Sequence, residues 1–386
     1  MKSRSVSIVG MAETQLGVIK DRSPMELGAT AVVGACADAG LSVGDIDGLI
    51  TSNSLVAPLM YHAEATAEYL GITPRHCLSV ATGGGTTFTA IHHAAMAIEA
   101  GLADTVVVAM ADSMRSGLSR EQALRVQASS GHPVYERPYC PTVPAYYALI
   151  ARAHMDAYGT TEEQLAEAMV SSRAWAANNP TSQYRDLVSV ADVLASPLIA
   201  DPLRLLDCSI VSDGGAALVL TRTERAADMA QPAVELLGYG EAHHYEHISQ
   251  APSLTTSAAA ESGRMAYAQA GLGPEKIDIA QLYDCFSIAL LIQLEDLGFC
   301  AKGEGGAFLQ SGATRPDGAL PVNTHGGMLS HCHPGNPGAL FAVTEAVKQF
   351  RGEAGERQQT DVNHILLHAQ GGIMSSHSSL ILGRGH

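Results

Sequence analysis

Side chains that can move a proton gather in two short segments of the sequence. The candidates are His325, His331, Cys332 and His333 within "VNTHGGMLSHCHPG" (322–335), and Tyr283 at the start of "YDCFS". A histidine gives or takes a proton near neutral pH, and a buried phenol can donate to a developing oxyanion or shuttle a proton. The alternate spacing of the histidines in a glycine-rich loop lacks the carboxylate and open-site pattern of a zinc enzyme. We therefore expect acid–base chemistry here and no metal.

Glycine-rich turns that can present backbone N–H groups occur early and late in the chain. The stretch "CLSVATGGGTTFTAIHHAAMAIEAG" (77–101) is a glycine turn that runs into an apolar helix, a place where many acyl-transfer enzymes keep a nucleophile. This turn offers Gly84 and Gly85 instead of a nucleophile. Near the end of the chain, "HAQGGIMSSHSS" holds a second pair, Gly371 and Gly372.

Composition excludes several classes of protein. The chain has 386 residues, of which 46% are hydrophobic and 16% charged, so it can bury the core of two domains or of one double domain. A net charge of -16 with 23 scattered Lys and Arg residues disfavours nucleic-acid binding. Seven cysteines without a CxxC pair indicate a reducing compartment, with the cytoplasm as the default. No run of eighteen apolar residues occurs, so we expect no membrane span and no signal peptide.

Short β-branched runs alternate with alanine-rich helical stretches, which is typical of an α/β protein with both faces of its sheets covered. Strands are expected at 5–11, 104–111, 216–221 and 364–370, and helices at Pro24–Ala39, Thr87–Ala100 and Leu340–Phe350.

An internal repeat indicates the architecture. "CADAGLSVGDID" (36–47) aligns with "YAQAGLGPEKID" (267–278), each in the context of a helix end, a glycine turn and a following strand. The economical interpretation is two similar halves, 1–225 and 226–386. The alternative is chance similarity between two Ala/Gly-rich helix ends.

Three ordered segments resemble the thiolase superfamily, most closely the branch related to the sterol carrier protein thiolases. "LIADPLRLLDCSIVSDGGAALVLT" (198–221) resembles the end of that family's first half, "YDCFSIALLIQLEDLGFCAKGEGG" (283–306) its HDCFS segment, and residues 322–335 its "NPSGG…KGHP" segment. The resemblance implies a thiolase-like five-layer αβαβα fold and an inserted loop region, here at about 113–200. It also implies CoA thioester substrates and no covalently bound cofactor.

In thiolases a Cys lies at the N-terminus of a buried helix, where the helix dipole and free N–H groups lower its pKa. The family's spacing places Gly84 at that position, and reading "VATG" as the family's "CxTG" places Val80 there instead. Neither residue has a thiol. Cys77 precedes the glycine turn and is expected in the preceding strand. The resemblance therefore implies no covalent acyl-enzyme.

Other family positions carry over residue by residue. His333 matches the thiolase "GHP" histidine, and Tyr283 stands where the sterol carrier protein thiolases have His. Gly371 stands where the family has a Cys-Gly segment that helps to form an oxyanion hole, and the acid–base Cys of that segment is missing. The candidate catalytic residues are Tyr283, His333, His368 and Cys332, with His377 as a further replacement acid. The candidate substrate-binding residues are Gly84, Gly85, His325, Gly326, Gly371 and Gly372.

Backbone oxyanion donors with a general base, and without a nucleophile, suit retro-aldol cleavage of a β-hydroxyacyl-CoA through a thioester enolate. The chain resembles the steroid side-chain aldolases of the same superfamily, which lack the Cys and carry a Tyr at the Tyr283 position. Those aldolases have a second Tyr at the His333 position, whereas this sequence keeps the thiolase His. Two alternatives stay open: a thiolase-type acyltransferase that uses Cys77, Cys332 or a partner's thiol, and a non-catalytic subunit that binds acyl-CoA or lipid.

Substrate and partners are expected from the same resemblance and from local composition. The aromatic and proline-rich segment 132–147 can shape an apolar acyl pocket for steroid, aromatic or aliphatic chains. Arg115, Arg120 and Arg125 either meet the CoA phosphates or lie on a solvated helix. Residues 104–111 lie close in sequence to the family's dimer strand, so we expect a homodimer. A small OB-fold partner with a zinc ribbon is a further expectation.

Overall fold

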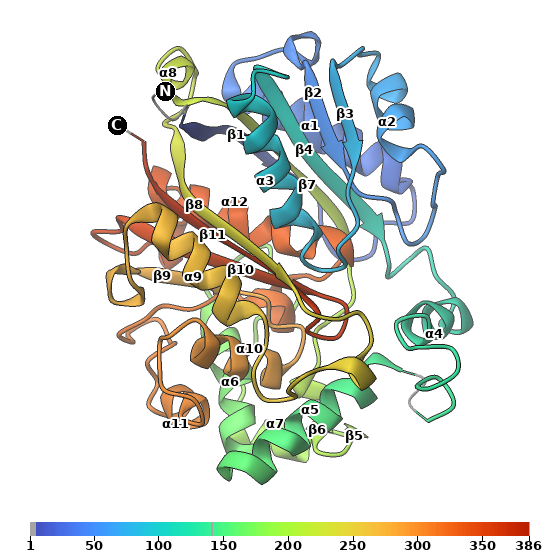
Figure 1. The fold of residues 1–386 in the computed structure, drawn as a ribbon, viewed down its shortest axis with the longest axis vertical. Helices are drawn as coiled ribbons and strands as arrows, with labels where there is room; N and C mark the ends of the chain where they lie inside the picture. The colour runs from blue at the N-terminus through green and yellow to red at the C-terminus, as the bar shows by residue number, and fades with distance from the viewer. Residues whose placement is uncertain (1–4, 140–141, 386) are drawn as a thin grey trace.

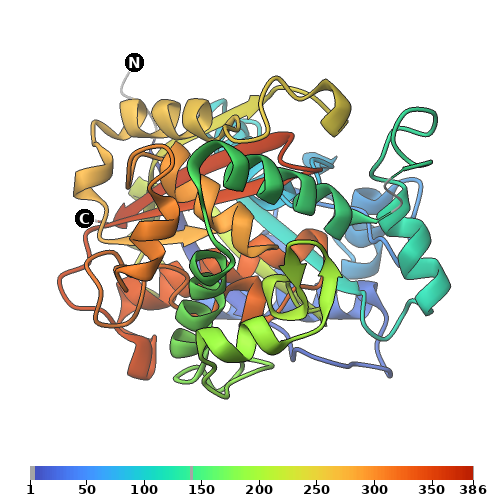
Figure 2. The same cartoon turned by 90° about the horizontal axis from the view of Figure 1, so that it is seen from below.

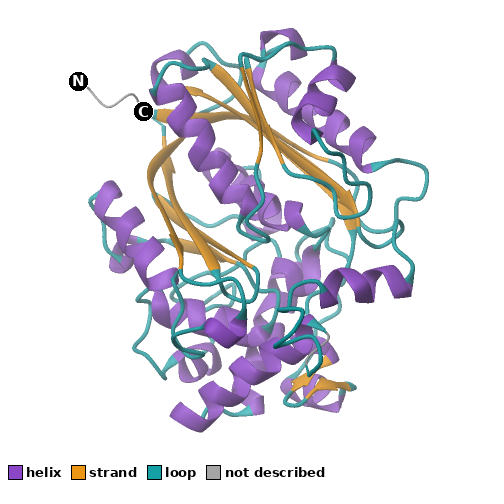
Figure 3. Ribbon diagram, turned by 45° about the vertical axis from the view of Figure 1, so that its right-hand side comes forward, coloured by secondary structure: helices purple, strands orange, loops and turns teal. Residues whose placement is uncertain are grey.

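The computed structural model describes residues 5–139 and 142–385. Nine strands form one hydrogen-bonded order, β3-β2-β4-β7-β1-β8-β11-β10-β9, in which only two residue pairs join β1 to β8. Figure 3 shows that the two groups of strands diverge from this junction, with helices between them. The strands of the first group are β1 (Val6–Glu13), β2 (Gly48–Thr51), β3 (His76–Ser79), β4 (Thr105–Ser113) and β7 (Asp213–Arg222). Those of the second are β8 (Val234–His243), β9 (Ile279–Leu282), β10 (His364–Gly371) and β11 (Ser376–Arg384).

Two helices form the middle layer. Helix α3 (Thr86–Glu99) contacts β4 and β7 on one side and β10 and β11 on the other, and α12 (Leu340–Arg351) also contacts strands of both groups (Figure 1). Helix α1 (Pro24–Ala39) covers the outer face of the first group, and α9 (Ala259–Ala270) covers that of the second. The predicted αβαβα layering is confirmed, with α3 and α12 as its central layer.

The strand order repeats between the two groups. The second group runs β9-β10-β11-β8, which corresponds to β2-β4-β7-β1, and Val322 forms an isolated parallel bridge to Ala280 at the place that β3 takes in the first group. The aligned aspartates make equivalent contacts: Asp47 accepts from the N–H of Thr105 at the start of β4 (2.8 Å), and Asp278 accepts from the N–H of His364 at the start of β10 (2.9 Å). These equivalent contacts favour a true repeat over chance similarity, while the boundary at 225/226 stays a prediction.

The inserted region is mainly helical rather than a loop. It contains α4 (Arg120–Ala128), α5 (Val143–Tyr158), α6 (Glu162–Ala176), α7 (Val190–Ala195) and the hairpin β5 (Leu198–Ala200) and β6 (Leu203–Arg204). Capping boxes begin α4, α6 and α7. Helices α5 and α6 bury apolar faces against α10 (Ser287–Asp296), whereas α4 has no buried residue and protrudes, as Figures 1 and 2 show. The remaining helices are α2 (His62–Leu70), α8 (Thr223–Ala226) and α11 (Gly305–Gln310).

The position of strand β4 in the sheet bears on the expected homodimer. Strand β4 lies inside the sheet, paired on both sides by β2 and β7, so the free edge of this half belongs to β3. Within the described residues, every helix is too short or too polar to cross a membrane.

Candidate active site

A cavity of about 250 Å³ opens where the two halves meet the inserted region. Polar groups and apolar groups line different parts of its wall. The polar lining residues include Ser209, Tyr283, His333 and Gln370, and the apolar ones include Met114, Val143, Pro144, Tyr147, Val211 and Phe286. The rings of Tyr147 and Phe286 are stacked, with centroids 4.3 Å apart. The cavity therefore combines a small set of hydrogen-bonding groups with an aromatic surface, which is typical of a small-molecule site.

Tyr283 follows β9 directly, and its backbone is held on both sides. Its N–H donates to the carbonyl of His368 on β10 (3.1 Å) and to Oε1 of Gln293 (3.1 Å), while Nε2 of Gln293 donates to the Tyr283 carbonyl (2.8 Å). Gln293 lies on α10 and is fully buried. Burial also raises the pKa of the Tyr283 phenol well above its usual value, with smaller contributions from Cys285 and Asp284. The phenol is therefore a fixed, protonated group at the cavity wall.

His333 lies opposite Tyr283 and is held through its ring and its backbone. Its Nε2 lies 3.1 Å from Oη of Tyr283, and its Nδ1 lies 2.9 Å from Oγ of Ser209. Its N–H donates to Oγ of Ser212 (3.0 Å). Burial lowers the pKa of His333 to about 4, so the ring is neutral at physiological pH. The structure brings together Tyr283 and His333, the two residues that the sequence ranks first.

Gly84 lines the cavity at the turn before α3, directly beside the phenol. A Cβ built on Gly84 would lie 2.3 Å from both Cζ and Oη of Tyr283 and 2.5 Å from the Gln370 carbonyl oxygen. Such distances are far inside van der Waals contact, so a side chain at position 84 is incompatible with this placement of Tyr283. Gly85 is the N-cap residue of α3 and is not among the residues that line the cavity.

The two glycine segments meet at the cavity. A Cβ on Gly83 would lie 2.7 Å from the backbone nitrogen of Gly372, and one on Gly371 would lie 1.7 Å from the carbonyl oxygen of Thr82. This close approach of two backbones requires glycine on both sides. Gly372 lines the cavity together with Gly84, so one glycine from each turn lies on its wall.

Other predicted catalytic residues lie elsewhere. His368 points within the sheet, where its Nε2 meets Nδ1 of His377 (3.0 Å) and its Nδ1 meets Oγ of Ser379 (2.8 Å). Cys332 is buried and absent from the cavity wall, and burial raises the pKa of its thiol well above the usual value. Cys77 lies on β3, in the strand that the sequence predicts. The structure does not bring these three residues to the cavity.

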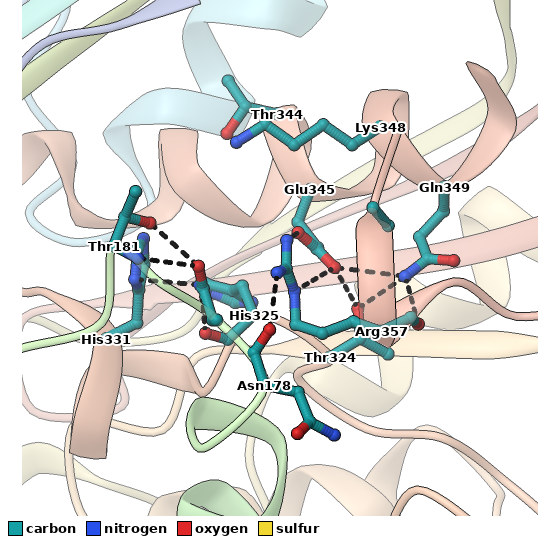
Figure 4. Close-up of polar contacts among 12 residues, drawn as sticks. Asn178, Thr181, Thr324, His325, His331, Thr344, Glu345, Lys348, Gln349 and Arg357 are labelled. Atoms are coloured by element: carbon teal, nitrogen blue, oxygen red, sulfur yellow. Dashed lines mark hydrogen bonds and ion pairs between the residues drawn. The ribbon is translucent and has the colours of Figure 1, made fainter. Parts of the chain in front are cut away.

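His325 and Gly326 belong to a separate buried polar cluster. Figure 4 shows His325 between His331 and the ion pair of Arg357 with Glu345, whose Nη2 and Oε2 are 2.9 Å apart. The rings of His325 and His331 meet edge to face with centroids 5.3 Å apart. His331 points to Asn179, not toward the cavity, so the three histidines of this segment do not converge.

Sequence reasoning missed several cavity residues. Ser209 comes from "DCS" in the segment that marks the end of the first half, and Gln370 comes from "HAQGG". Nε2 of Gln370 donates to Oη of Tyr147 (2.6 Å) and to Sγ of Cys285 (3.2 Å). Cys285 follows the candidate Tyr283 by two residues. Its position close to a candidate residue could therefore have identified it from the sequence. For Ser209 the signal was the family segment itself.

Among the described residues, Cys208 and Cys285 also line the cavity, and neither is a predicted catalytic residue. Burial raises the pKa of Cys208 and that of Cys285 to about 12 each. Because the thiolate is the nucleophile, both residues are inert near neutral pH. Among the arginines considered for CoA phosphates, Arg125 pairs with Glu121 on the exposed surface of α4 (2.5 Å).

Comparison with known proteins identifies the family of the chain. The chain matches the thiolase N-terminal domain over residues 6–224 and the thiolase C-terminal domain-like family over residues 240–384. A steroid side-chain-cleaving aldolase of Thermomonospora curvata is 36% identical and aligns over 98% of both chains. An acetyl-CoA acetyltransferase of Methanothermobacter thermautotrophicus is 34% identical, over 96% of this chain and 97% of that protein.

A solved structure is similar over the whole chain. The structure of an Ltp2-ChsH2(DUF35) aldolase superposes with a TM-score of 0.88 at 33% identity, covering 99% of this chain and 98% of that one. Both halves of the fold, the cavity between them and these full-length matches lead to one assignment: the chain belongs to the thiolase superfamily.

Proposed function

We propose that the protein is a lyase that cleaves a β-hydroxyacyl-CoA by a retro-aldol reaction, without a covalent acyl-enzyme. The observation that carries this proposal is the hydrogen bond between Tyr283 and His333 on the cavity wall, in the space beside Gly84 where thiolases hold their nucleophile. The similarity to a steroid side-chain-cleaving aldolase supports it.

The reaction needs a base for the β-hydroxyl proton and donors for the enolate. Tyr283 accepts the substrate's hydroxyl proton while it gives its own proton to Nε2 of His333. The Cα–Cβ bond then breaks, its electron pair moves to the thioester to form an enolate, and the β-carbon becomes an aldehyde or ketone. The amides of Gly84 and Gly372, both on the cavity wall, stabilise the enolate oxygen.

The identity of the acyl chain follows only in outline from the cavity. The stacked rings of Tyr147 and Phe286, with Val143 and Pro144 beside them, favour an apolar chain. Steroid side chains, aromatic groups and aliphatic chains all satisfy this chemistry. His333 distinguishes the site from the steroid aldolases that the sequence resembles, because those carry a second Tyr at this position.

The second candidate function is that of an acyltransferase, supported by the similarity to an acetyl-CoA acetyltransferase and by the two cysteines in the cavity. The raised pKa values of Cys208 and Cys285 count against it. A non-catalytic acyl-CoA-binding subunit needs neither the Tyr283–His333 pair nor its backbone supports, which favours the enzyme.

We also propose that the protein forms a homodimer and binds a small partner protein. The free edge of β3 supports a homodimer formed by pairing of edge strands. The solved aldolase pairs Ltp2 with ChsH2(DUF35), and we propose that this chain also works with a small partner, of the OB-fold and zinc-ribbon kind.

The requirement for free CoA separates the two reactions. A retro-aldol lyase converts a β-hydroxyacyl-CoA into a carbonyl compound and a shorter acyl-CoA without added CoA. A thiolase cleaves a β-ketoacyl-CoA only when free CoA is supplied. Each substrate is incubated with the protein by itself and with its copurifying partner, and the products are identified by mass spectrometry. The expected result is cleavage of the β-hydroxyacyl-CoA and no cleavage of the β-ketoacyl-CoA. CoA-dependent cleavage of the β-keto substrate would instead establish the acyltransferase.

A further inference from the structure

Ser209, His333 and Tyr283 form a continuous hydrogen-bonded chain along one wall of the cavity. The distance from Oγ of Ser209 to Nδ1 of His333 is 2.9 Å, and that from Nε2 of His333 to Oη of Tyr283 is 3.1 Å. All three residues line the cavity. Within residues 5–139 and 142–385, neither terminal hydroxyl makes a second hydrogen bond. Both ends of the chain are therefore available to a molecule in the cavity.

The position of Ser209 is fixed independently of its hydroxyl. Its N–H donates to the carbonyl of Cys285 (2.9 Å), two residues after Tyr283. The neighbouring Cys208 forms an isolated antiparallel bridge to Phe286. Three residues further on, the N–H of Ser212 donates to the His333 carbonyl (3.3 Å). The segment 208–212 thus bonds to the backbone of His333 and to that of Cys285, two residues after Tyr283, and helps to set the spacing of the chain.

The half-buried imidazole of His333 is a poor group on which to leave an extra proton. Desolvation lowers its pKa to about 4, and within the described residues no carboxylate bonds to its ring. A protonated His333 would be a poorly solvated cation without a counter-ion among those residues. A proton that enters at Nε2 is accommodated at lower cost if the proton on Nδ1 leaves in the same step. Ser209 is the group placed to take that proton.

We propose, on the basis of the retro-aldol function above, that Ser209 is a catalytic residue that completes a proton relay and protonates the enolate. The β-hydroxyl proton passes to Oη of Tyr283, the phenol proton to Nε2 of His333, the Nδ1 proton to Oγ of Ser209, and the hydroxyl proton of Ser209 to the substrate Cα. The broken Cα–Cβ bond supplies the electron pair for the new C–H bond. The products are a carbonyl compound and the shortened acyl-CoA, with every protein group neutral.

The relay ends with His333 in its opposite tautomer, protonated at Nε2. Once the products leave, water in the cavity takes the proton from Tyr283 and supplies one to Ser209, which reverses the chain. No oxidant, metal or further residue is needed. The relay therefore accounts for a half-buried neutral histidine between the hydroxyl groups of two residues that line the cavity.

Three variants and a solvent isotope experiment test the relay. Ser209→Ala is expected to lower kcat by ~10²-fold, as for loss of an acid–base group, with KM nearly unchanged. Ser209→Thr keeps a hydroxyl and is expected to restore most of the turnover. In mixtures of H₂O and D₂O, kcat of the wild type is expected to fall along a strongly curved line, because the four protons of the relay move together, whereas Ser209→Ala, which keeps only the transfers through Tyr283 and His333, is expected to show weaker curvature. Ser212→Ala, which loosens the backbone of His333 but leaves the chain intact, is expected to keep the wild-type curvature.

The outcomes separate the relay from the proposed function. If the wild type cleaves the substrate and Ser209→Ala matches its kcat, or keeps the full wild-type curvature of the isotope dependence, the relay is wrong and the retro-aldol function stands. If the wild type fails to cleave any β-hydroxyacyl-CoA, the proposed function and the relay fall together. A Ser209→Thr variant as slow as Ser209→Ala would also count against the relay, since the hydroxyl is then not the group that matters.

Discussion

The hydroxyl of Tyr283 lies where a side chain at position 84 would begin: a Cβ on Gly84 would be 2.3 Å from Oη and from Cζ of the phenol. The phenol of Tyr283 thus occupies the space that a side chain at position 84 would need. The resemblance to thiolases places their nucleophile at Gly84 or at Val80, and the space beside Gly84 holds a phenol hydrogen-bonded to His333. A side chain at position 84 and this placement of Tyr283 therefore exclude each other.

Substitution of Gly84 tests this relationship. Gly84→Ala is expected to destabilise the protein by about 1–3 kcal/mol and to abolish most turnover, because the new methyl group overlaps the phenol and the Gln370 carbonyl. Gly28→Ala on α1 is the matched control, since its Cβ would meet only Ala111 at 3.8 Å. That control is expected to be neutral or slightly stabilising. Thermal unfolding and turnover of both variants check the prediction, and an active, stable Gly84→Ala variant would refute it.

Cysteine chemistry is expected to be dispensable. Cys77→Ser and Cys332→Ser alter residues away from the cavity, and Cys208→Ala removes a thiol whose pKa of about 12 keeps it protonated. Each variant is expected to keep most of the turnover. Intact-mass measurement of the protein during turnover is expected to show no acyl adduct. An adduct that maps to Cys208 or Cys285 would establish a covalent mechanism instead.

Stability is expected to fall in mild acid. Burial lowers the pKa values of His325, His333 and His377 to about 4 each, whereas an unfolded chain protonates histidine near 6.5. Between these values the unfolded state binds more protons, so the free energy of unfolding decreases as the pH falls from about 6.5 toward 4. For fully buried His377 the loss is on the order of 3 kcal/mol. Urea unfolding at pH 7, 6 and 5 measures it, and a constant free energy across this range would contradict the burial of these rings.

The fold was largely predictable because its signals are local. The strand at 364–370 is a short, largely apolar run, and the helix at Pro24–Ala39 is marked by a capping box and a C-terminal glycine, so their bounds are nearly those observed. The inserted region was harder. Its helices α5 and α6 form against α10 from the other half of the chain, and this packing is invisible in a short window of sequence.

The site was predictable only where a family motif names the residue. Tyr283 and His333 stand in such motifs, and the structure brings them together. His368 also stands beside a motif, yet the alternation of side chains along β10 directs it toward His377. Ser209 reaches the cavity through long-range bonds to Cys285 and His333, which neither composition nor spacing reveals.

The central claim is that Tyr283 and His333 carry the proton transfer of a retro-aldol cleavage. The most direct test is kcat for β-hydroxyacyl-CoA cleavage by Tyr283→Phe and His333→Ala, with Tyr245→Phe as a control whose hydroxyl bonds to the Ile373 carbonyl outside the cavity. Each of the first two variants is expected to lose ~10²–10⁴ in kcat while it keeps its fold by circular dichroism. The control is expected to retain wild-type turnover. Wild-type kcat in a folded Tyr283→Phe or His333→Ala variant would contradict the account.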